Sequence, residues 1–214
     1  FSFNNAKQTI WAIAPEEGGE AAISGAHFDK SSNLEAYSQY HLKTAYYWTR
    51  WLPEHHVISM EARALMTDKK IPNILGDSST IYSSPLTSTY LIRGYLDGQF
   101  TGRNIFNTNI EYQFPVMSYA KWHGLFPFFI KRIHGAVVLD AISIDGIAYK
   151  QPTKTFVDVN RDRIFGSGGA EARVDTTLGY VIPLQLVVGV HAPFQTDYNR
   201  NPTLLVQINS GLGF

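Results

Sequence analysis

The chain has 214 residues, in which 18 lysines and arginines balance 18 aspartates and glutamates, and it contains no cysteine. The neutral charge excludes a global electrostatic attraction to nucleic acid, and the lack of cysteine excludes disulfides, thiolate zinc sites and a cysteine nucleophile. Only 17% of the residues are charged while 14% are aromatic. Ordinary soluble domains have about a quarter charged residues, so something other than charge must cover the surface.

No segment approaches the ~20 consecutive apolar residues of a membrane-spanning helix. Instead, polar and apolar residues alternate along most of the chain, which predicts strands because successive strand side chains point to opposite faces. About nine strands are expected, over residues 5–14, 20–29, 37–51, 55–67, 104–115, 128–143, 171–178, 181–193 and 203–214. No segment has a convincing helical period, so the predicted fold class is all-β and antiparallel.

The connections between these strands alternate in length. The long ones are residues 68–103, 144–169 and 194–202, and the tight ones are residues 52–54 and 179–180. A transmembrane β-barrel has this asymmetry, with short periplasmic turns and longer extracellular loops. Residues 117–128 are expected to form a turn of intermediate length, which fits the pattern less well.

Each expected strand has one polar and one apolar face, as residues 104–115 illustrate. The polar side consists of Asn107, Asn109, Glu111 and Gln113, and the apolar side consists of Phe106, Ile110, Tyr112 and Phe114. A soluble β-barrel would turn the apolar side inward, around a cavity suited to a small apolar ligand. Two features favour the opposite arrangement, in which the apolar side meets lipid.

The first feature is that opposite charges share the polar faces, which suits a wet interior; they are Glu61 with Arg63, Arg132 with Asp140, and Glu171 with Arg173. The second is that aromatic residues lie near strand ends on the apolar faces; they are Tyr40, Tyr46, Trp48 and Tyr112. Aromatic girdles of this kind meet the lipid headgroups of membrane barrels. We therefore expect an antiparallel transmembrane β-barrel with a charge-paired interior.

The last expected strand ends on an aromatic residue. One of its faces consists of Leu204, Val206, Ile208, Leu212 and Phe214. Because lipid admits only sealed backbone hydrogen bonding, such a strand must belong to a closed barrel. A terminal phenylalanine on an amphipathic strand resembles the C-terminal signature of bacterial outer-membrane proteins. Leu212 and Phe214 are thus the expected signal for the barrel assembly machinery.

Three motifs occur in order along the second half of the chain: LIRGY at 91–95, EYQFP at 111–115 and HGAVVLDA at 134–141. Together they resemble the bacterial surface antigen barrels, the superfamily of the outer-membrane protein insertase and its translocation relatives. Residues 168–194 resemble that family's last hairpin. The resemblance covers most of the chain and implies a barrel of sixteen strands, of which residues 1–214 would be the C-terminal portion.

In this family a long extracellular loop folds back into the barrel, and its Arg-Gly-aromatic tip pairs with acids on the inner wall of the next two strands. The resemblance implies that the connection at 68–103 is this loop. Its tip would be Arg93, Gly94 and Tyr95, and the acids would be Glu111 and Asp140. The alternation of side chains independently places both acids on polar faces. An arginine fork donates in parallel to carboxylates, so we expect the pairing to hold the loop rather than to do chemistry.

The resemblance also implies a location and partners. The location is the bacterial outer membrane, and the partners are its lipid, the barrel assembly machinery, and a client polypeptide or an upstream periplasmic domain. PEEGG at 15–19 and LPEHHVISMEARA at 52–64 resemble a branch in which a TolB-like β-propeller precedes the barrel. The implied function is protein insertion or translocation, or the anchoring of a periplasmic domain. The alternatives are a soluble β-barrel that binds a small apolar ligand and a passive structural barrel or pore.

No enzymatic activity, nucleic-acid partner or cofactor is expected, because the sequence contains no nucleophile elbow and no glycine-rich phosphate loop. His55 and His56 are adjacent at a turn and make a poor metal pair. Asp158, Asn160 and Asp162 have the spacing of a calcium loop. That loop also needs a glycine at its sixth position and an acid at its twelfth, and both are missing, so these three residues are only a weak candidate for a metal site.

Overall fold

The computed structural model of the chain describes residues 1–7, 13–30, 36–68, 92–95, 99–122, 128–178 and 182–210, with the backbone alone described at 101–103, 118–122, 128 and 210. These residues form one antiparallel sheet of ten strands and no helix. The strands are β1 Ser2–Asn4, β2 Gly18–Phe28, β3 Tyr37–Trp48, β4 Val57–Thr67, β5 Phe100–Trp122, β6 Phe128–Lys150, β7 Thr155–Val159, β8 Ile164–Leu178, β9 Ile182–Pro193 and β10 Thr203–Ser210.

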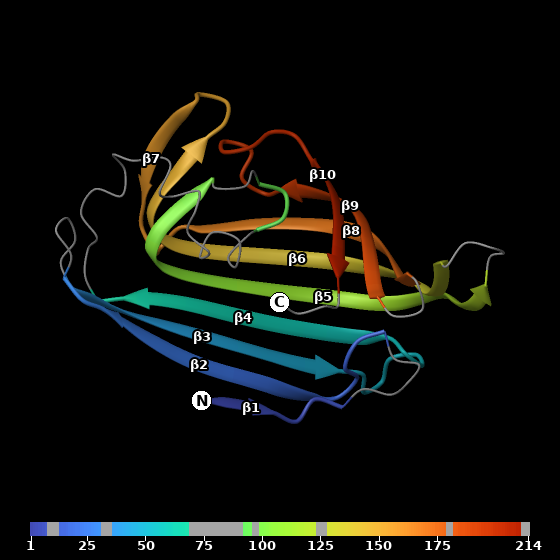
Figure 1. Cartoon of the computed structure of the whole chain (residues 1–214). Coiled ribbons are helices and arrows are strands. Elements are labelled where there is room, and N and C mark those ends of the chain that lie inside the picture. Colours follow the sequence, from blue (N-terminus) through green and yellow to red (C-terminus); the bar gives the residue numbers. More distant parts are fainter. Residues whose placement is uncertain are drawn as a thin grey trace.

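The sheet is a meander in which chain neighbours pair with each other, in the order β1-β2-β3-β4-β5-β6-β8-β9-β10. β7 lies off this path and pairs with the last five residues of β6, beyond the point where β8 begins its own pairing with β6. The sheet curves strongly (Figure 1). It is not closed into a barrel: in the part of the chain that the structure describes, β1 pairs only with β2 and β10 only with β9.

The prediction of an all-β antiparallel fold is confirmed, but three segments differ from their expected structure. The expected connection at 144–169 is wrong, because β6 continues to Lys150, β7 follows, and β8 begins at Ile164. Ile142 and Ile144 are fully buried on the inner face there, so the polar and apolar alternation stops although the backbone remains extended. Residues 8–12 of the expected strand at 5–14 lie outside the described residues, and the described part of that segment forms no strand but only a bridge between Lys7 and Glu17.

The expected turn at 117–128 is also largely strand. β5 runs on to Trp122, and β6 begins at Phe128. Bulges interrupt the pairing of β5 with β6 between Pro115 and Met117 and again between Ser118 and Lys121. Proline lacks a backbone N–H and so interrupts a ladder, and the two irregularities break the period on which the prediction depended.

The two faces of the sheet differ in polarity as the alternation predicts. On the convex face, Phe106 is 52% exposed and Ile110 is 38% exposed, whereas Glu111 on the concave face is only 8% exposed. The exposed large apolar residues of strands β3, β4, β5, β6, β9 and β10 include Tyr40, Leu42, Tyr46, Trp48, Met60, Met66, Phe106, Ile110, Val137, Leu139, Val188, Val190, Leu204, Val206 and Ile208. The convex face is thus apolar, and buried polar and charged side chains such as Glu111 lie on the concave face.

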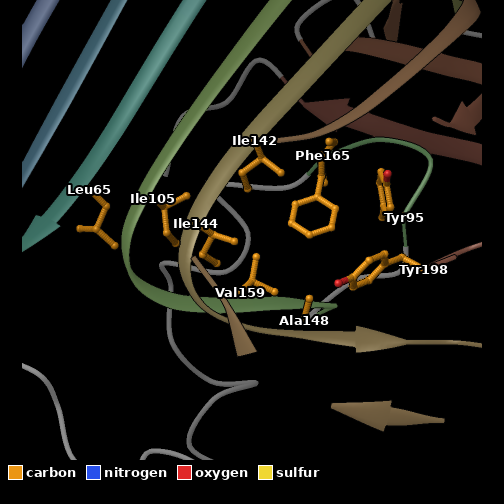
Figure 2. Packing of buried hydrophobic residues seen from close by; sticks show 10 residues of the cluster. Leu65, Tyr95, Ile105, Ile142, Ile144, Ala148, Val159, Phe165 and Tyr198 are labelled. Atoms are coloured by element: carbon orange, nitrogen blue, oxygen red, sulfur yellow. The ribbon is translucent and has the colours of Figure 1, made fainter. Parts of the chain in front are cut away.

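At the end of the sheet that has the long connections, the concave face is filled by an apolar cluster (Figure 2). It consists of Leu65, Ile92, Tyr95, Ile105, Ile142, Ile144, Ala148, Val159, Phe165 and Tyr198. Two of these residues, Ile92 and Tyr95, come from the connection between β4 and β5. The cluster therefore packs this connection against the inner wall.

Candidate functional site

Residues Ile92 to Tyr95, called the tip below, lie on the concave side of the sheet (Figure 1). The tip is a tight turn in which the Tyr95 amide donates to the Ile92 carbonyl over 3.4 Å. Ile92 and Tyr95 are at most 5% exposed. Gly94 has φ +89°, and a Cβ added there would lie 3.1 Å from the Cβ of Ser167 on β8. The tip therefore needs glycine for its backbone conformation and for its close approach to the wall.

Gly94→Ala is expected to lower the free energy of unfolding by about 1–3 kcal/mol, because alanine is strained at positive φ and its methyl group meets Ser167. The midpoint of urea unfolding measures this change. Gly25→Ala is the matched control, since Gly25 lies within β2 at an ordinary strand φ and its new methyl group would lie 3.3 Å from the ring of Tyr40 and 3.8 Å from the Gln39 carbonyl. Equal midpoints for the two variants would show that the tip is not held against the wall.

The guanidinium of Arg93 contacts one carboxylate on each of three neighbouring strands. Nη2 donates to Glu111 Oε1 on β5 over 2.8 Å, and Nη1 donates to Glu171 Oε1 on β8 over 2.8 Å. Nε donates to Asp140 Oδ2 on β6 over 2.9 Å, and the Arg93 backbone amide donates to the same oxygen over 3.3 Å. Neighbouring strands are about 4.8 Å apart, so the planar fork bridges three of them at once.

A second arginine, Arg173 on β8, completes this arrangement. Its Nη2 donates to Glu111 Oε2 over 2.8 Å and to Glu171 Oε2 over 2.5 Å. Glu111 and Glu171 are each shared by both arginines, whereas Asp140 has Arg93 and the amide of Asn109 as its partners. The residues Arg93, Arg173, Glu111, Asp140 and Glu171 are called the charge cluster below.

The charge cluster is shielded from water, which strengthens its internal contacts. Its three acids are between 5% and 8% exposed. Burial alone would lower the pKa of Arg93, but the charges of Asp140, Glu111 and Glu171 outweigh this effect and raise the pKa above the ordinary arginine value. Burial also raises the pKa of Tyr95 to about 12. Near neutral pH the tip therefore presents a permanent cation and a neutral phenol that donates hydrogen bonds.

Tyr95 and Gly94 contact residues that the sequence did not point to. The Tyr95 hydroxyl donates to Gln195 Oε1 over 2.6 Å and to the Gly166 carbonyl over 3.1 Å. Asn199 Nδ2 donates to the Gly94 carbonyl over 2.9 Å. Gln195 and Asn199 lie in the connection between β9 and β10, where no motif marked them.

The structure thus brings Arg93 together with Glu111 and Asp140, the two acids named for it, and adds Glu171, which was not assigned to it. Glu171 could have been found from sequence, because it lies on the polar face of the next strand and belongs to the same alternation. Of the three other expected charge pairs, two are present: Glu61 contacts Arg63, and Glu171 contacts Arg173. The expected pair of Arg132 with Asp140 is wrong, because these residues are eight positions apart along β6, and Arg132 instead contacts Asp175 over 2.8 Å.

The remaining predicted sites lie elsewhere. Asp158, Asn160 and Asp162 are exposed, and the described residues contain no group of three His, Cys, Asp or Glu side chains able to hold a metal ion. His55 contacts Glu16 over 3.0 Å, and His56 Nδ1 lies 2.6 Å from the Tyr112 hydroxyl. Leu212 and Phe214, the expected assembly signal, lie outside the described residues, as does most of the connection at 68–103.

The contacts of the charge cluster hold the tip in position against the wall. All three nitrogens of the buried arginine fork donate to carboxylates of the same chain, so the guanidinium holds the tip against the wall. Over the described ranges, the structure has no helix long and apolar enough to cross a membrane. Comparison with protein-family models, with curated proteins and with solved structures finds no match to this chain.

Proposed function

We propose that the chain is part of the wall of a transmembrane β-barrel of the surface-antigen type in a bacterial outer membrane. It would serve protein insertion or translocation, or anchor a periplasmic domain. The observation that carries the proposal is the polarity of the curved sheet, with apolar residues exposed outside and buried charges inside. Water would favour the reverse arrangement, and the hydrocarbon of a bilayer favours this one.

The distribution of aromatic residues on the sheet supports the proposal. At the end with the short connections, Trp48 and Trp51 form an edge-to-face pair with ring centroids 5.9 Å apart, and Trp51 is 86% exposed. Towards the opposite end of β3, Tyr40 is 54% exposed on the same apolar face. Aromatic residues near both ends of an apolar surface are typical of membrane barrels, where they lie at the two headgroup layers.

Strand parity explains how the open sheet fits a barrel. The path from β1 to β10 contains nine consecutive antiparallel strands, so its two edge strands run in the same direction. Antiparallel closure therefore requires an odd number of further strands between these edges. Seven strands beside these nine would make the sixteen-stranded barrel of the surface antigen family, and closure would remove both exposed edges from the bilayer.

The alternative, a soluble barrel with an apolar cavity, has less support. The apolar part of the concave face already has an occupant, because Ile92 and Tyr95 pack into it from the same chain. In a soluble barrel, the large apolar surface of the convex face would also stay in contact with water. A passive barrel or pore has the same wall, and the presence or absence of a client polypeptide separates it from a translocase.

Membrane fractionation tests the proposal. We expect the protein, expressed in a Gram-negative host with an export signal, to stay in the membrane pellet after extraction with alkaline carbonate or with 6 M urea, and to enter solution only with detergent. The physical reason is that extraction into water would expose the convex apolar face. A protein that is monodisperse in buffer without detergent would contradict the proposal and favour the soluble barrel.

A further inference from the structure

The connection between β9 and β10, residues 194–202, contacts the tip through residues that do not belong to the charge cluster. Gln195 Oε1 accepts the Tyr95 hydroxyl over 2.6 Å, and Asn199 Nδ2 donates to the Gly94 carbonyl over 2.9 Å. The ring of Tyr198 packs edge to face against Phe165, which in turn contacts the ring of Tyr95. None of these contacts involves a charged group of the tip, so they form a second and independent attachment.

This connection is itself firmly seated on the sheet. Asn199 is 2% exposed and Tyr198 is 1% exposed. The Gln195 side chain accepts the Gly166 amide over 2.9 Å and donates to the Ile164 carbonyl over 3.0 Å, both on β8. A residue next to β5 contributes as well, because Gln99 Nε2 donates to the Tyr198 carbonyl over 3.1 Å. The connection thus joins the wall strand β8 to the tip and to Gln99, the residue just before β5.

The same connection leads directly into β10, which is an edge strand. β10 begins at Thr203, four residues after Asn199, and among the described strands it pairs with β9 alone. The register partner of Thr203 is His191 on β9, and His191 Nε2 lies 3.1 Å from Glu171 Oε1, the oxygen that accepts Arg93. Two chains of contacts therefore lead from the start of β10 to the tip, one through Asn199 and one through His191 and Glu171.

We propose that residues 194–202 are a latch that couples the pairing of edge strand β10 with β9 to the seating of the tip on the concave face. When β10 pairs with β9, Gln195 and Asn199 are in place to hold Tyr95 and Gly94. When the tip leaves the wall, the latch loses these partners and the start of β10 loses support. The coupling is reciprocal, since contacts that stabilise one element when the other is in place act in both directions. It depends only on contacts within the chain and stands apart from the membrane proposal.

Thiol labelling measures whether the tip is seated. The protein has no cysteine, so Ile92→Cys introduces a single thiol at a position that is 3% exposed. In this background, Asn199→Ala is expected to increase the rate of maleimide labelling about 5- to 30-fold, the range for losing one or two buried hydrogen bonds. Asp197→Ala, at an exposed position of the same connection, is the matched control and should leave the rate unchanged. An unchanged rate for Asn199→Ala would overturn the latch.

Hydrogen exchange measures the coupling in the other direction. Tyr95→Phe removes only the hydroxyl that Gln195 accepts and keeps the ring, so it also serves for the labelling test if Asn199→Ala does not fold. We expect amides in residues 203–210 to exchange about fivefold faster in Tyr95→Phe than in the parent protein, while amides in residues 37–48 are unchanged. Unchanged exchange in β10 would overturn the coupling, even if labelling of Cys at position 92 shows that the tip is released.

Discussion

Arg93→Ala is expected to lower the free energy of unfolding by about 3–5 kcal/mol, because removing the arginine leaves buried carboxylates with too little positive charge. Asp140 is the acid that loses its compensating positive charge. Glu111 and Glu171 keep Arg173 as a partner, whereas Asp140 keeps the amide of Asn109. Urea unfolding of the protein folded in detergent micelles measures the change, and cleavage of the connection between β4 and β5 by added protease reports whether the tip has left the wall.

The unequal partners of the three acids allow a sharper version of this experiment. Asp140→Asn in the Arg93→Ala background should recover part of the lost stability, because it neutralises the acid that has lost its cation. Glu171→Gln in the same background should recover less, because that carboxylate still contacts Arg173. Arg161→Ala, at an exposed position, controls for the loss of an arginine as such. Unaltered stability and unaltered protease resistance in Arg93→Ala would show that the charge cluster does not hold the tip.

Ile110→Arg is expected to cost about 2–4 kcal/mol in a bilayer, the range for a basic residue on the lipid face at the midplane of a barrel. Ile110 lies near the middle of β5, pairs with Leu139 at the middle of β6, and points to the convex face. In water, the same substitution at a position that is already 38% exposed would change stability by about 0.5 kcal/mol or less. The size of the effect therefore separates lipid from water as the surroundings of this face.

The matched control for this prediction is Phe156→Arg. Phe156 is a large apolar residue that is 65% exposed, but it lies on β7, which is off the main path of the sheet and pairs with the end of β6, far from the middle of the strands. It should cost about 0–1 kcal/mol, as expected near an interface. The free energy of unfolding of both variants is measured by urea unfolding in phosphatidylcholine vesicles. Equal and small losses would mean that the convex face does not meet hydrocarbon, and the membrane proposal would then fail.

Local periodicity is enough to assign the two faces of the strands from sequence alone. Alternation at a period of two depends only on neighbouring residues, so Phe106 and Ile110 could be placed opposite Glu111 without knowing what packs against either face. The same reasoning predicted an antiparallel all-β fold with alternating long and short connections. It failed where the local pattern stopped, at residues 144–150, since the inner face there is apolar and the strand continues without alternation.

The pairing of Arg93 with Glu111 and Asp140 was expected from motifs, but its full form depends on long-range register. Glu171 joins the cluster because the registers of β6 with β5 and with β8 bring three separate acids within reach of one fork. The roles of Gln195 and Asn199 depend on the docking of two connections that are about a hundred residues apart in sequence. The side-chain amides of Gln195 and Asn199 are not part of an alternating pattern along a strand. Their roles are therefore set only by the partners that folding brings next to them.

The sequence by itself determined which side of each strand is polar, because that property is set by nearest neighbours along the chain. Only the tertiary structure decided how many acids surround Arg93, how the connection at 194–202 holds the tip, and that the path of nine described strands has unpaired edges at β1 and β10 within the described residues. These features come from strand register, sheet curvature and loop docking. Each of them is a sum of contacts between residues far apart in sequence, which alternation along one strand does not encode.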